Sequence, residues 1–221
     1  MKVTLLNHSE VLIELDHHIL LFDEYQAPLT INKDKPLYIF ASHSHGDHFS
    51  RKIFSIDHPD KHYILSDDIR ANNQDYTFVK PHQTITIDDL EISTLFSTDL
   101  GVAFIVKVEG QTIYFAGDLH DWDWPGEPEE DNTWQTTHYL EEISLIKEPV
   151  DLACVVVDDR LEENTFKGFD EFLEHVNAKV LLPIHYFGHY RISKELSQHL
   201  ESVKTKTDVL LPEHANHEFI I

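Results

Sequence analysis

Four side chains that can bind a metal ion fall within six residues of the chain: His43, His45, Asp47 and His48. They follow the apolar run Leu37–Phe40, which has the length and composition of a β-strand. A strand that ends in such a turn directs its imidazoles and its carboxylate into one small volume. Nitrogen and oxygen donors of this kind suit Zn²⁺, and also Mn²⁺, Fe²⁺ or Co²⁺. The chain has 17 histidines, so a solvated histidine-rich loop is the competing interpretation, and a metal site is the leading one.

The length and composition predict one globular domain. At 221 residues the chain is expected to form a single domain, 1–221, and its 41% apolar content excludes a disordered chain. No apolar run approaches the roughly 18–20 residues that span a bilayer, so no membrane partner is expected. The N-terminal segment breaks too soon for a signal peptide, and the one cysteine, Cys154, lies in an apolar run. Without a disulfide framework, the protein is expected to be cytoplasmic.

The charge of the chain is strongly negative. Lys and Arg number 17 against 40 Asp and Glu, which gives a net charge of −23 with histidine neutral. A field of that sign repels phosphate backbones unless metals or local cations reverse it. No nucleic-acid partner is therefore expected. A small phosphorylated substrate stays open, because divalent cations dominate the charge locally.

Short apolar runs dominate the first half of the chain and alternate with helical patterns in the second half. Strands are predicted at Val3–Leu6, Val11–Leu15, Ile19–Phe22, Leu37–Ala41, His62–Leu65, Tyr76–Val79, Thr84–Ile87, Leu90–Phe96, Val102–Val108, Thr112–Phe115, Asp151–Val157 and Lys179–Ile184. Helices are predicted at Thr133–Lys147, Phe169–Val176 and Ser193–Val203. The pattern alone indicates a mixed α/β (α+β) domain. Unpaired strand edges would allow a homodimer, and the oligomeric state stays open.

Beyond the HxHxDH turn, three more motifs lie at or just after the end of a predicted strand. Gly117-Asp118 follows one strand, Pro183-Ile184-His185 ends a later one, and Asp23 follows an early hairpin. With HxHxDH, they resemble the metallo-β-lactamase superfamily of metal-dependent hydrolases, in its small lactonase-like and RNase-Z-like branches. The resemblance covers nearly the whole chain. It implies a four-layer αββα sandwich whose strand ends converge on one edge.

The resemblance also implies a ligand set. His43 and His45 would belong to a first metal, His48 and His185 with Asp47 to a second, and Asp118 would bridge them. Asp47 and Asp118 would be the catalytic carboxylates. The family usually supplies a third histidine to the first metal, and no histidine occurs in the matching segment, residues 95–102.

Three outcomes of this missing histidine stay open. Asp99 or His120 could replace the absent ligand, the first site could be weak, or the protein could hold a single metal. An oxygen ligand such as Asp99 would shift the preference toward Mn²⁺ or Fe²⁺. One or two Zn²⁺ ions per chain are expected, with Mn²⁺ or Fe²⁺ as alternatives. Asp23 is a candidate to orient one of the ligating histidines.

The resemblance implies hydrolysis by a metal-bound hydroxide. The substrate would be a small-molecule lactone, ester or phosphoester. The alternative is a one-metal binding protein of the same fold with little or no hydrolytic activity.

The substrate-side candidates are four residues in two loops. Trp122 and Trp124 follow the bridging aspartate and would either wall a pocket or pack their loop onto the body. His189 and Arg191 follow His185 and would either bind an anionic group or lie on the surface. Arg160, after the strand Asp151–Val157, is a further candidate for such a group.

Overall fold

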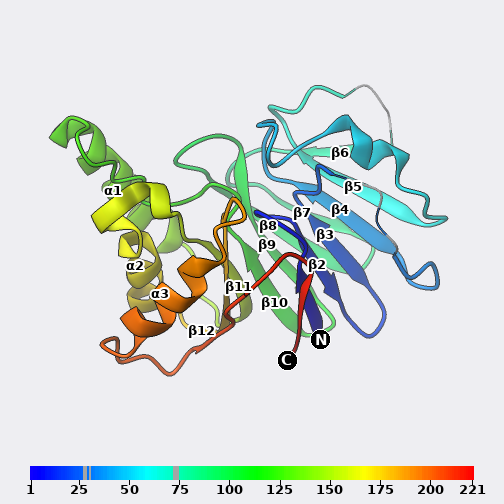
Figure 1. The fold of residues 1–221 in the computed structure, drawn as a ribbon. Helices are drawn as coiled ribbons and strands as arrows, with labels where there is room; N and C mark the ends of the chain where they lie inside the picture. The colour runs from blue at the N-terminus through cyan, green and yellow to red at the C-terminus, as the bar shows by residue number, and fades with distance from the viewer. Residues whose placement is uncertain (27–28, 30, 72–74) are drawn as a thin grey trace.

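Two β-sheets packed face to face form the body of the molecule, and three helices cover one side (Figure 1). The computed structural model describes residues 1–26, 29, 31–71 and 75–221. Within these ranges each sheet has seven strands. Every strand predicted from the sequence overlaps an observed one.

The two sheets divide the chain by sequence, except for the last strand. Sheet A has the order β14 (His217–Ile220), β1 (Lys2–Leu5), β2 (Val11–Glu14), β3 (Ile19–Phe22), β4 (Leu37–Ala41), β5 (Lys61–Ser66) and β6 (Tyr76–Val79). Sheet B has the order β13 (Asp208–Val209), β12 (Ala178–Ile184), β11 (Val150–Val156), β10 (Gln111–Phe115), β9 (Val102–Val108), β8 (Leu90–Phe96) and β7 (Thr84–Ile87). The helices are η1 (Arg51–Ser55), α1 (Glu129–Ile143), η2 (Asp159–Asn164), α2 (Lys167–His175) and α3 (Arg191–Leu200), where η marks a 3₁₀-helix.

Both sheets are mixed, and their pairing directions bring several strand ends to one edge. In sheet A, β3, β4, β5 and β6 are parallel neighbours, while β1 and β2 form an antiparallel meander with β3. In sheet B, β10, β11, β12 and β13 are parallel, and β9 and β8 run antiparallel in turn. The carboxyl ends of β1, β3 and β4, and those of β8, β10, β11 and β12, therefore point to the same edge within their sheets.

Aromatic side chains from both sheets form the centre of the sandwich. Phe22 of β3 stacks on Phe40 of β4 and on Phe115 of β10, with ring centroids 4.6 Å apart in both pairs. Phe104 of β9 packs edge-on against Phe40 at 5.2 Å. All four side chains are fully buried, and burial of each such ring stabilises the fold by roughly 1.5–3 kcal/mol.

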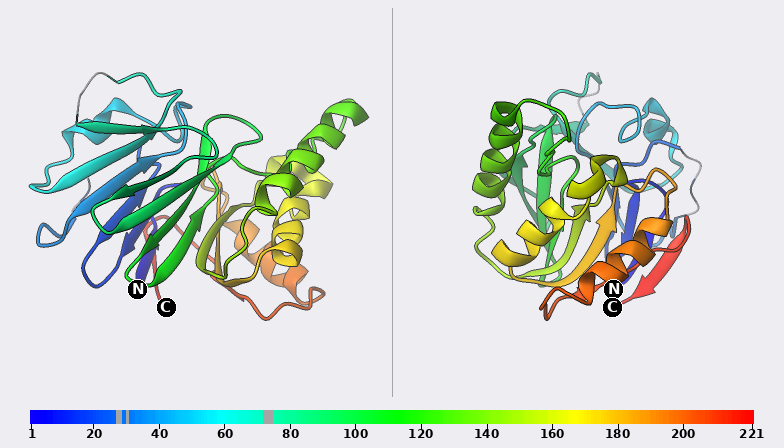
Figure 2. Two further views of the ribbon diagram at one scale, coloured as in Figure 1. Left: turned by 180° about the vertical axis from the view of Figure 1, so that it is seen from behind. Right: turned by 60° about the vertical axis from the view of Figure 1, so that its left-hand side comes forward.

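The helices α1, α2 and α3 lie together on the outer side of sheet B, as the two views of Figure 2 show. Phe172 of α2 stacks on Tyr114 of β10 at 5.1 Å, and this contact fixes the helix to the sheet. On the outer face of sheet A the described helical element is the short 3₁₀-helix η1, whose Ile53 joins a second apolar cluster there. A helical layer was predicted on the outer face of each sheet. Sheet B is covered by three α-helices, whereas the described part of sheet A is covered by one short 3₁₀-helix.

The first helix is displaced from its predicted position. The apolar spacing predicts Thr133–Lys147, whereas α1 spans Glu129–Ile143. The chain enters the helix from Pro128, and three acidic residues occupy the first turn, where they interact favourably with the helix dipole. The prediction was wrong because the apolar pattern ignored this polar N-terminal turn.

Among the described residues, no helix is both long and apolar enough to cross a membrane.

Candidate metal centre

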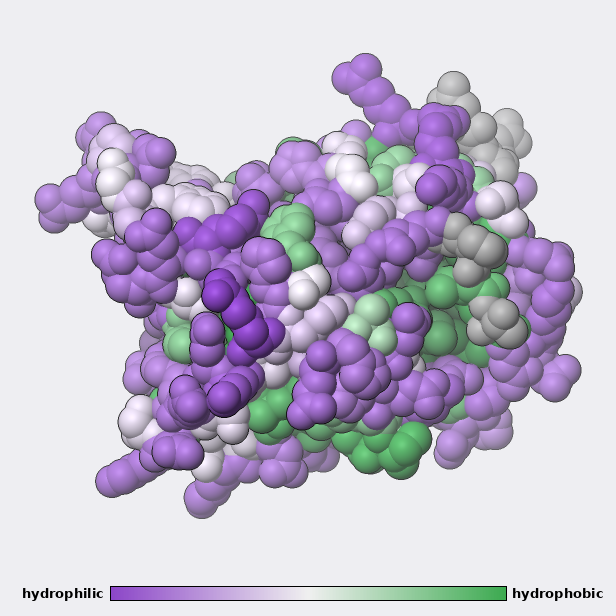
Figure 3. All heavy atoms as spheres, viewed as in Figure 1, coloured by the Kyte–Doolittle hydropathy of each residue, from purple (hydrophilic) through white to green (hydrophobic). Residues whose placement is uncertain are grey.

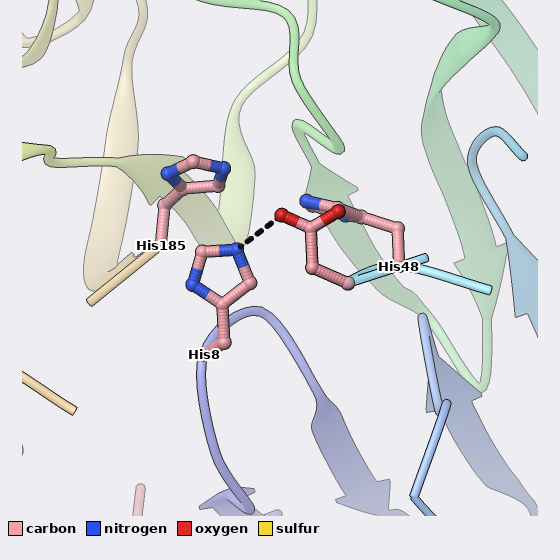
Figure 4. A group of neighbouring side chains, drawn as sticks. His8, His48 and His185 are labelled. Carbon is pink, nitrogen blue, oxygen red and sulfur yellow. Dashed lines mark ion pairs between the residues drawn. The ribbon is translucent and has the colours of Figure 1, made fainter. Parts of the chain in front are cut away.

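The sequence-predicted ligands gather at the edge where the strand ends meet. The HxHxDH turn follows β4, Asp118 follows β10 and His185 follows β12. Asp23 follows β3, and His8 lies in the loop after β1. In Figure 4 the side chains of His8, His48 and His185 lie close together at this edge. The fold thus brings together residues that are up to 177 positions apart in the sequence.

Hydrogen bonds fix the tautomers of two histidines of the turn. His48 Nδ1 lies 2.7 Å from Asp23 Oδ2, so the carboxylate accepts a proton from that nitrogen. The Ser42 hydroxyl donates to the same carboxylate oxygen at 2.6 Å, so Ser42 Oγ is left to accept from His43 Nδ1 at 2.9 Å. Both rings therefore carry their proton on Nδ1 and present the lone pair of Nε2 to the site.

His185 is oriented in the same way from the other sheet. Its Nδ1 lies 2.9 Å from Asp158 Oδ2, at the end of β11. His185 also has a left-handed backbone with φ of 77°, and Asp23 has φ of 47°. Non-glycine residues hold such conformations only where the surrounding structure fixes them, and they cluster at functional sites.

Asp118 stands at the centre of the three oriented rings. Its carboxylate oxygens lie 3.1 Å from His48 Nε2, 3.3 Å from His185 Nε2 and 3.4 Å from His43 Nε2. Among the described residues, Asp118 Oδ1 and the Nε2 atoms of His43 and His48 are buried and make no hydrogen bond. Lone pairs that face one another at this distance repel unless a cation lies between them.

A divalent cation fits this donor set. Two atoms at about 2.0–2.1 Å from one ion at a tetrahedral angle are ~3.3 Å apart, close to the observed spacings. Burial opposes charge on both His48 and Asp118, but the opposite charges outweigh it. A proton and a metal ion therefore compete for His48 Nε2: the aspartates raise the pKa of His48 well above its usual range, and the imidazoles lower that of Asp118 well below its usual range.

Among the described residues, the potential ligand atoms form three groups: Asp23 with His43 and His48, which are linked by the hydrogen bonds given above, and two larger clusters that meet at Asp118. The first cluster consists of His43, His45, Asp99 and Asp118, and the second of His8, Asp47, His48 and His185, with the ligand atoms of each cluster within 4.8 Å of one another. The six ligands predicted from the sequence are divided between these clusters.

Asp99, one of the two candidate replacements for the missing histidine, lies in the first cluster. Its Oδ2 lies 3.3 Å from His45 Nδ1, and both side chains are about half exposed, at 42% and 49%. His120, the other candidate replacement, lies outside both clusters. Its ring is fully buried against Trp122, and burial lowers its pKa to about 3. The geometry therefore favours Asp99 over His120 as the substitute ligand.

His8 was missed by the sequence analysis, and it belongs to the second cluster by position. Its ring is 1% exposed, and its Nδ1 accepts a hydrogen bond from the backbone N–H of Phe187 at 3.1 Å. The neutral ring must then carry its proton on Nε2, which lies 3.5 Å from Asp47 Oδ2 (Figure 4). Burial lowers the pKa of His8 to about 4, which keeps the ring neutral. His8 thus presents an N–H to the site, where the other three rings present lone pairs.

A cavity of about 250 Å³ opens over the centre, lined by His45, Asp47, Asp99, Asp118, Trp122, Trp124, Gln135, Arg160 and His185. The rings of Trp122 and Trp124 stack at 5.8 Å and wall one side. Trp122 Nε1 donates to the carbonyl of Asp118 at 3.0 Å, which ties this wall to the metal ligands. Both tryptophans predicted to contact substrate lie at the cavity.

The two other predicted substrate residues are placed elsewhere. His189 and Arg191 both contact the carboxylate of Asp159, at 3.0 Å and 2.8 Å, and neither lines the cavity. Arg160, from the same segment as Asp159, lines it instead. Any role of His189 and Arg191 in substrate binding stays a prediction.

A second cavity, of about 370 Å³, opens at the opposite edge of the sheets. It is lined by Met1, Leu15, Asp16, Glu109, Gln111, Asp151, Lys179, Val180 and Ile221. No histidine is among these residues, so this larger cavity offers no comparable ligand set.

No family model and no curated protein matches the chain. Solved structures do match, over nearly all of the chain. A candidate metal-dependent hydrolase from Parabacteroides distasonis is 21% identical with a TM-score of 0.63, over 96% of this chain and 92% of the other. The metallo-β-lactamase fold protein YhfI from Bacillus subtilis is 15% identical with a TM-score of 0.61, over 99% of both chains.

A third similar structure belongs to a different class of reaction. CmlA, a diiron β-hydroxylase from Streptomyces venezuelae, is 11% identical with a TM-score of 0.62. The match covers all of this chain but 54% of CmlA, so this chain spans about half of that protein. At these identities the likeness concerns the fold. The two seven-stranded sheets, with their helices, are the α/β sandwich of the metallo-β-lactamase fold.

Proposed function

We propose that the protein is a metal-dependent hydrolase that acts on a small-molecule lactone, ester or phosphoester in the cytoplasm. The observation that carries the proposal is the set of Nε2 lone pairs of His43, His48 and His185, aimed at the Asp118 carboxylate by hydrogen bonds on their other nitrogens. Such an arrangement is built to hold a cation. Its position at the floor of a cavity gives that cation access to a substrate.

When bound, a divalent metal lowers the pKa of a coordinated water and polarises a carbonyl or phosphoryl oxygen. The donors, imidazole and carboxylate, fit Zn²⁺ first and also Mn²⁺ or Fe²⁺. His43, His45, Asp99 and Asp118 would hold one ion, and Asp47, His48 and His185 with Asp118 would hold another.

The protein's own side chains divide the remaining work. Asp47 lines the cavity, and we assign it to orient the attacking water as a hydrogen-bond acceptor. The His8 N–H lies against the Asp47 carboxylate and holds its pKa well below the usual range, so this group stays ionised. Trp122 and Trp124 exclude bulk water from one side of the cavity.

A one-metal protein with little or no hydrolytic activity is the second candidate. It is favoured by the difference between the two clusters: His48 and His185 are buried, whereas His45 and Asp99 are about half exposed. An exposed pair of ligands holds a cation less firmly, because water competes for it. The first site is therefore the one whose occupancy separates the two candidates.

Metal content and turnover test the proposal together. Protein purified without chelator is analysed for Zn, Mn and Fe, before and after dialysis against each metal, and is assayed on a set of lactones, esters and phosphoesters. We expect about two ions per chain and metal-dependent hydrolysis of at least one of these classes. Asp118→Asn should lower kcat/KM by about 10²-fold or more with an unchanged circular dichroism spectrum. A firm single ion and no turnover on any class would establish the second candidate instead.

A further inference from the structure

One arginine lines the cavity over the metal centre, together with three aspartates. Among the residues that line the cavity over the metal centre, Arg160 is the one Lys or Arg, beside Asp47, Asp99 and Asp118. Acidic residues outnumber basic ones 40 to 17 in this chain, so a cation in this position requires an explanation.

The guanidinium of Arg160 is held rigidly on two sides. Its Nε lies 2.9 Å from both carboxylate oxygens of Asp158, and its Nη2 also donates to that carboxylate. Its Cζ lies over the ring of Phe187, 4.4 Å from the centroid, and over that of Trp124, 5.6 Å from the centroid. A guanidinium fixed in this way loses little further freedom when it binds a ligand.

One edge of the same group is left free. Among the described residues, Arg160 Nη1 donates no hydrogen bond, and the side chain is 47% exposed. The hydrogen bond to Asp158, and then the charges of Asp118 and Asp47, raise the pKa of Arg160, so it is always charged and lies within electrostatic reach of the metal ligands. Once cations offset Asp47 and Asp118, the edge of the guanidinium that Asp158 does not occupy is a fixed hydrogen-bond donor beside the reacting centre.

We propose that Arg160 is the anion-binding group of the substrate pocket. The substrate would be a small ester or lactone that carries a carboxylate or phosphate away from its scissile bond. Arg160 would bind this anionic group through its free edge, and the stacked Trp122 and Trp124 would contact the apolar body. The cavity of about 250 Å³ limits the ligand to a small molecule. This inference rests on the proposed hydrolase function.

A purely structural role for Arg160 makes a different prediction. Asp158 bonds both Arg160 and the metal-binding His185, so Arg160 could serve only to neutralise Asp158. Loss of the arginine would then weaken the metal centre and slow every substrate equally. A role in anion binding predicts a loss that is confined to anionic substrates.

Matched esters separate these outcomes. The metal-loaded protein is assayed on mono-4-nitrophenyl adipate, on the methyl ester of that compound, and on 4-nitrophenyl 5-phosphonopentanoate. Arg160→Met should lower kcat/KM about tenfold or more on the carboxylate or the phosphonate, chiefly through KM, and less than about twofold on the neutral methyl ester. Arg160→Lys should retain part of the preference. The anion that loses more identifies the natural group.

The remote variant Lys179→Met controls for the loss of one positive charge. Lys179 is exposed at the start of β12 and pairs with Asp151, at the opposite end of the strand from His185. The Lys179→Met substitution should change kcat/KM on none of the three esters by more than about twofold. An equal loss of all three rates in Arg160→Met, with reduced metal content, would assign Arg160 to the structural role. An unchanged preference would remove Arg160 from substrate binding.

A binding measurement keeps the inference testable if none of these esters is turned over. Calorimetry of monomethyl adipate and dimethyl adipate with the metal-loaded protein needs no catalysis. We expect the monoanion to bind at least about tenfold more tightly than the neutral diester, and Arg160→Met to abolish that difference. If the monoanion binds more tightly but no ester is turned over, the proposed hydrolase function is contradicted and the anion site is supported. If the two ligands bind equally, the anion site is contradicted.

Discussion

The direction of hydrogen bonds decides the chemistry of each imidazole at this site. His48 and His185 give their Nδ1 proton to Asp23 and Asp158, and so present lone pairs. His8 receives a proton at Nδ1 from the Phe187 backbone, and so presents an N–H. Identical side chains thus act as metal ligands or as a hydrogen-bond donor, according to what lies behind them.

His8 provides the first prediction. His8→Leu removes the N–H that faces Asp47, and we expect kcat to fall about 10–100-fold while KM and metal content are retained. His8→Gln places an amide near the position of Nε2 and should recover much of kcat. Kinetics and elemental analysis of both variants provide the test, and ¹⁵N NMR of the wild type should show the proton on Nε2. Loss of metal in His8→Leu would make His8 a ligand and contradict the assignment.

Glu10 gives a prediction about pH. Its side chain is 2% exposed, and burial together with the charge of Glu24 raises its pKa from 4.5 to about 7. Between these values the folded state holds a proton that the unfolded state releases, so the free energy of unfolding falls as pH rises from 4.5 to 7. Glu10→Gln keeps the carbonyl oxygen that accepts from Tyr25 and Gln26, and it removes this dependence.

Urea unfolding at pH 4.5 and at pH 8 measures the effect of Glu10→Gln. At pH 8 the variant should gain stability over the wild type by about 1–3 kcal/mol relative to their difference at pH 4.5. A parallel pH dependence in the two proteins would show that Glu10 ionises at its ordinary value.

The residues that stand in motifs could be predicted from the sequence, and those whose role comes only from a contact with a distant segment could not. HxHxDH lies in one turn, so its spacing alone predicts a ligand cluster. His8 acquires its partner from Phe187, 179 positions away, and no local pattern records that contact. Arg160 and Arg191 resemble each other as sequence signals. The fold distinguishes them, because it places Arg160 at the cavity and pairs Arg191 with Asp159.

At the scale of elements, the site depends on two loops that approach the HxHxDH turn very closely. A Cβ added at Gly117 would lie 2.6 Å from the Cβ of Ser42, and one added at Gly101 would lie 2.1 Å from the Ser42 carbonyl oxygen. Val102 N–H donates to that same carbonyl at 3.0 Å, which joins sheet B to sheet A beside the metal ligands. The strands could be predicted from their β-branched and aromatic runs. The contact between the two sheets at Ser42 could not, because no local pattern indicates it.

Gly101→Ala tests that junction. Gly101 has φ of 71°, and the new methyl group would meet the Ser42 backbone, so we expect a loss of about 2–5 kcal/mol of stability and weaker metal binding. Gly110 is a matched control, because it has φ of 73° but nothing within 4 Å of an added Cβ. Gly110→Ala should cost about 1–2 kcal/mol and leave metal binding intact. Equal losses in the two variants, measured by urea unfolding, would mean that the close approach is unimportant.

At the scale of the whole molecule, charge is the dominant surface property. The net charge is −23, and the face seen in Figure 3 is mainly hydrophilic with smaller apolar areas. Like charges spread over one compact body repel one another, and unfolding relieves that repulsion. The same field is the reason to expect small substrates and no nucleic-acid partner.

Salt should therefore stabilise the protein. Raising NaCl from about 20 mM to 500 mM shortens the screening length from roughly 20 Å to below 5 Å, and we expect the free energy of unfolding to rise by roughly 1 kcal/mol or more. Chloride is chosen over sulfate because sulfate also strengthens apolar burial. Urea titrations at several salt concentrations measure the effect. A decrease with salt would show that local ion pairs outweigh the net repulsion.

The pairing of β14 with β1 ties the order of synthesis to the order of folding. Lys2 pairs with Ile220 and Leu5 pairs with His217, so one flank of the first strand is covered by residues made more than 200 positions later. During translation the early strands of sheet A leave the ribosome with that flank open, and sheet B, which supplies the other half of the core, follows them. A nascent chain of this topology stays exposed to edge-to-edge association until its last strand emerges, and it is expected to benefit from holding by chaperones in that interval.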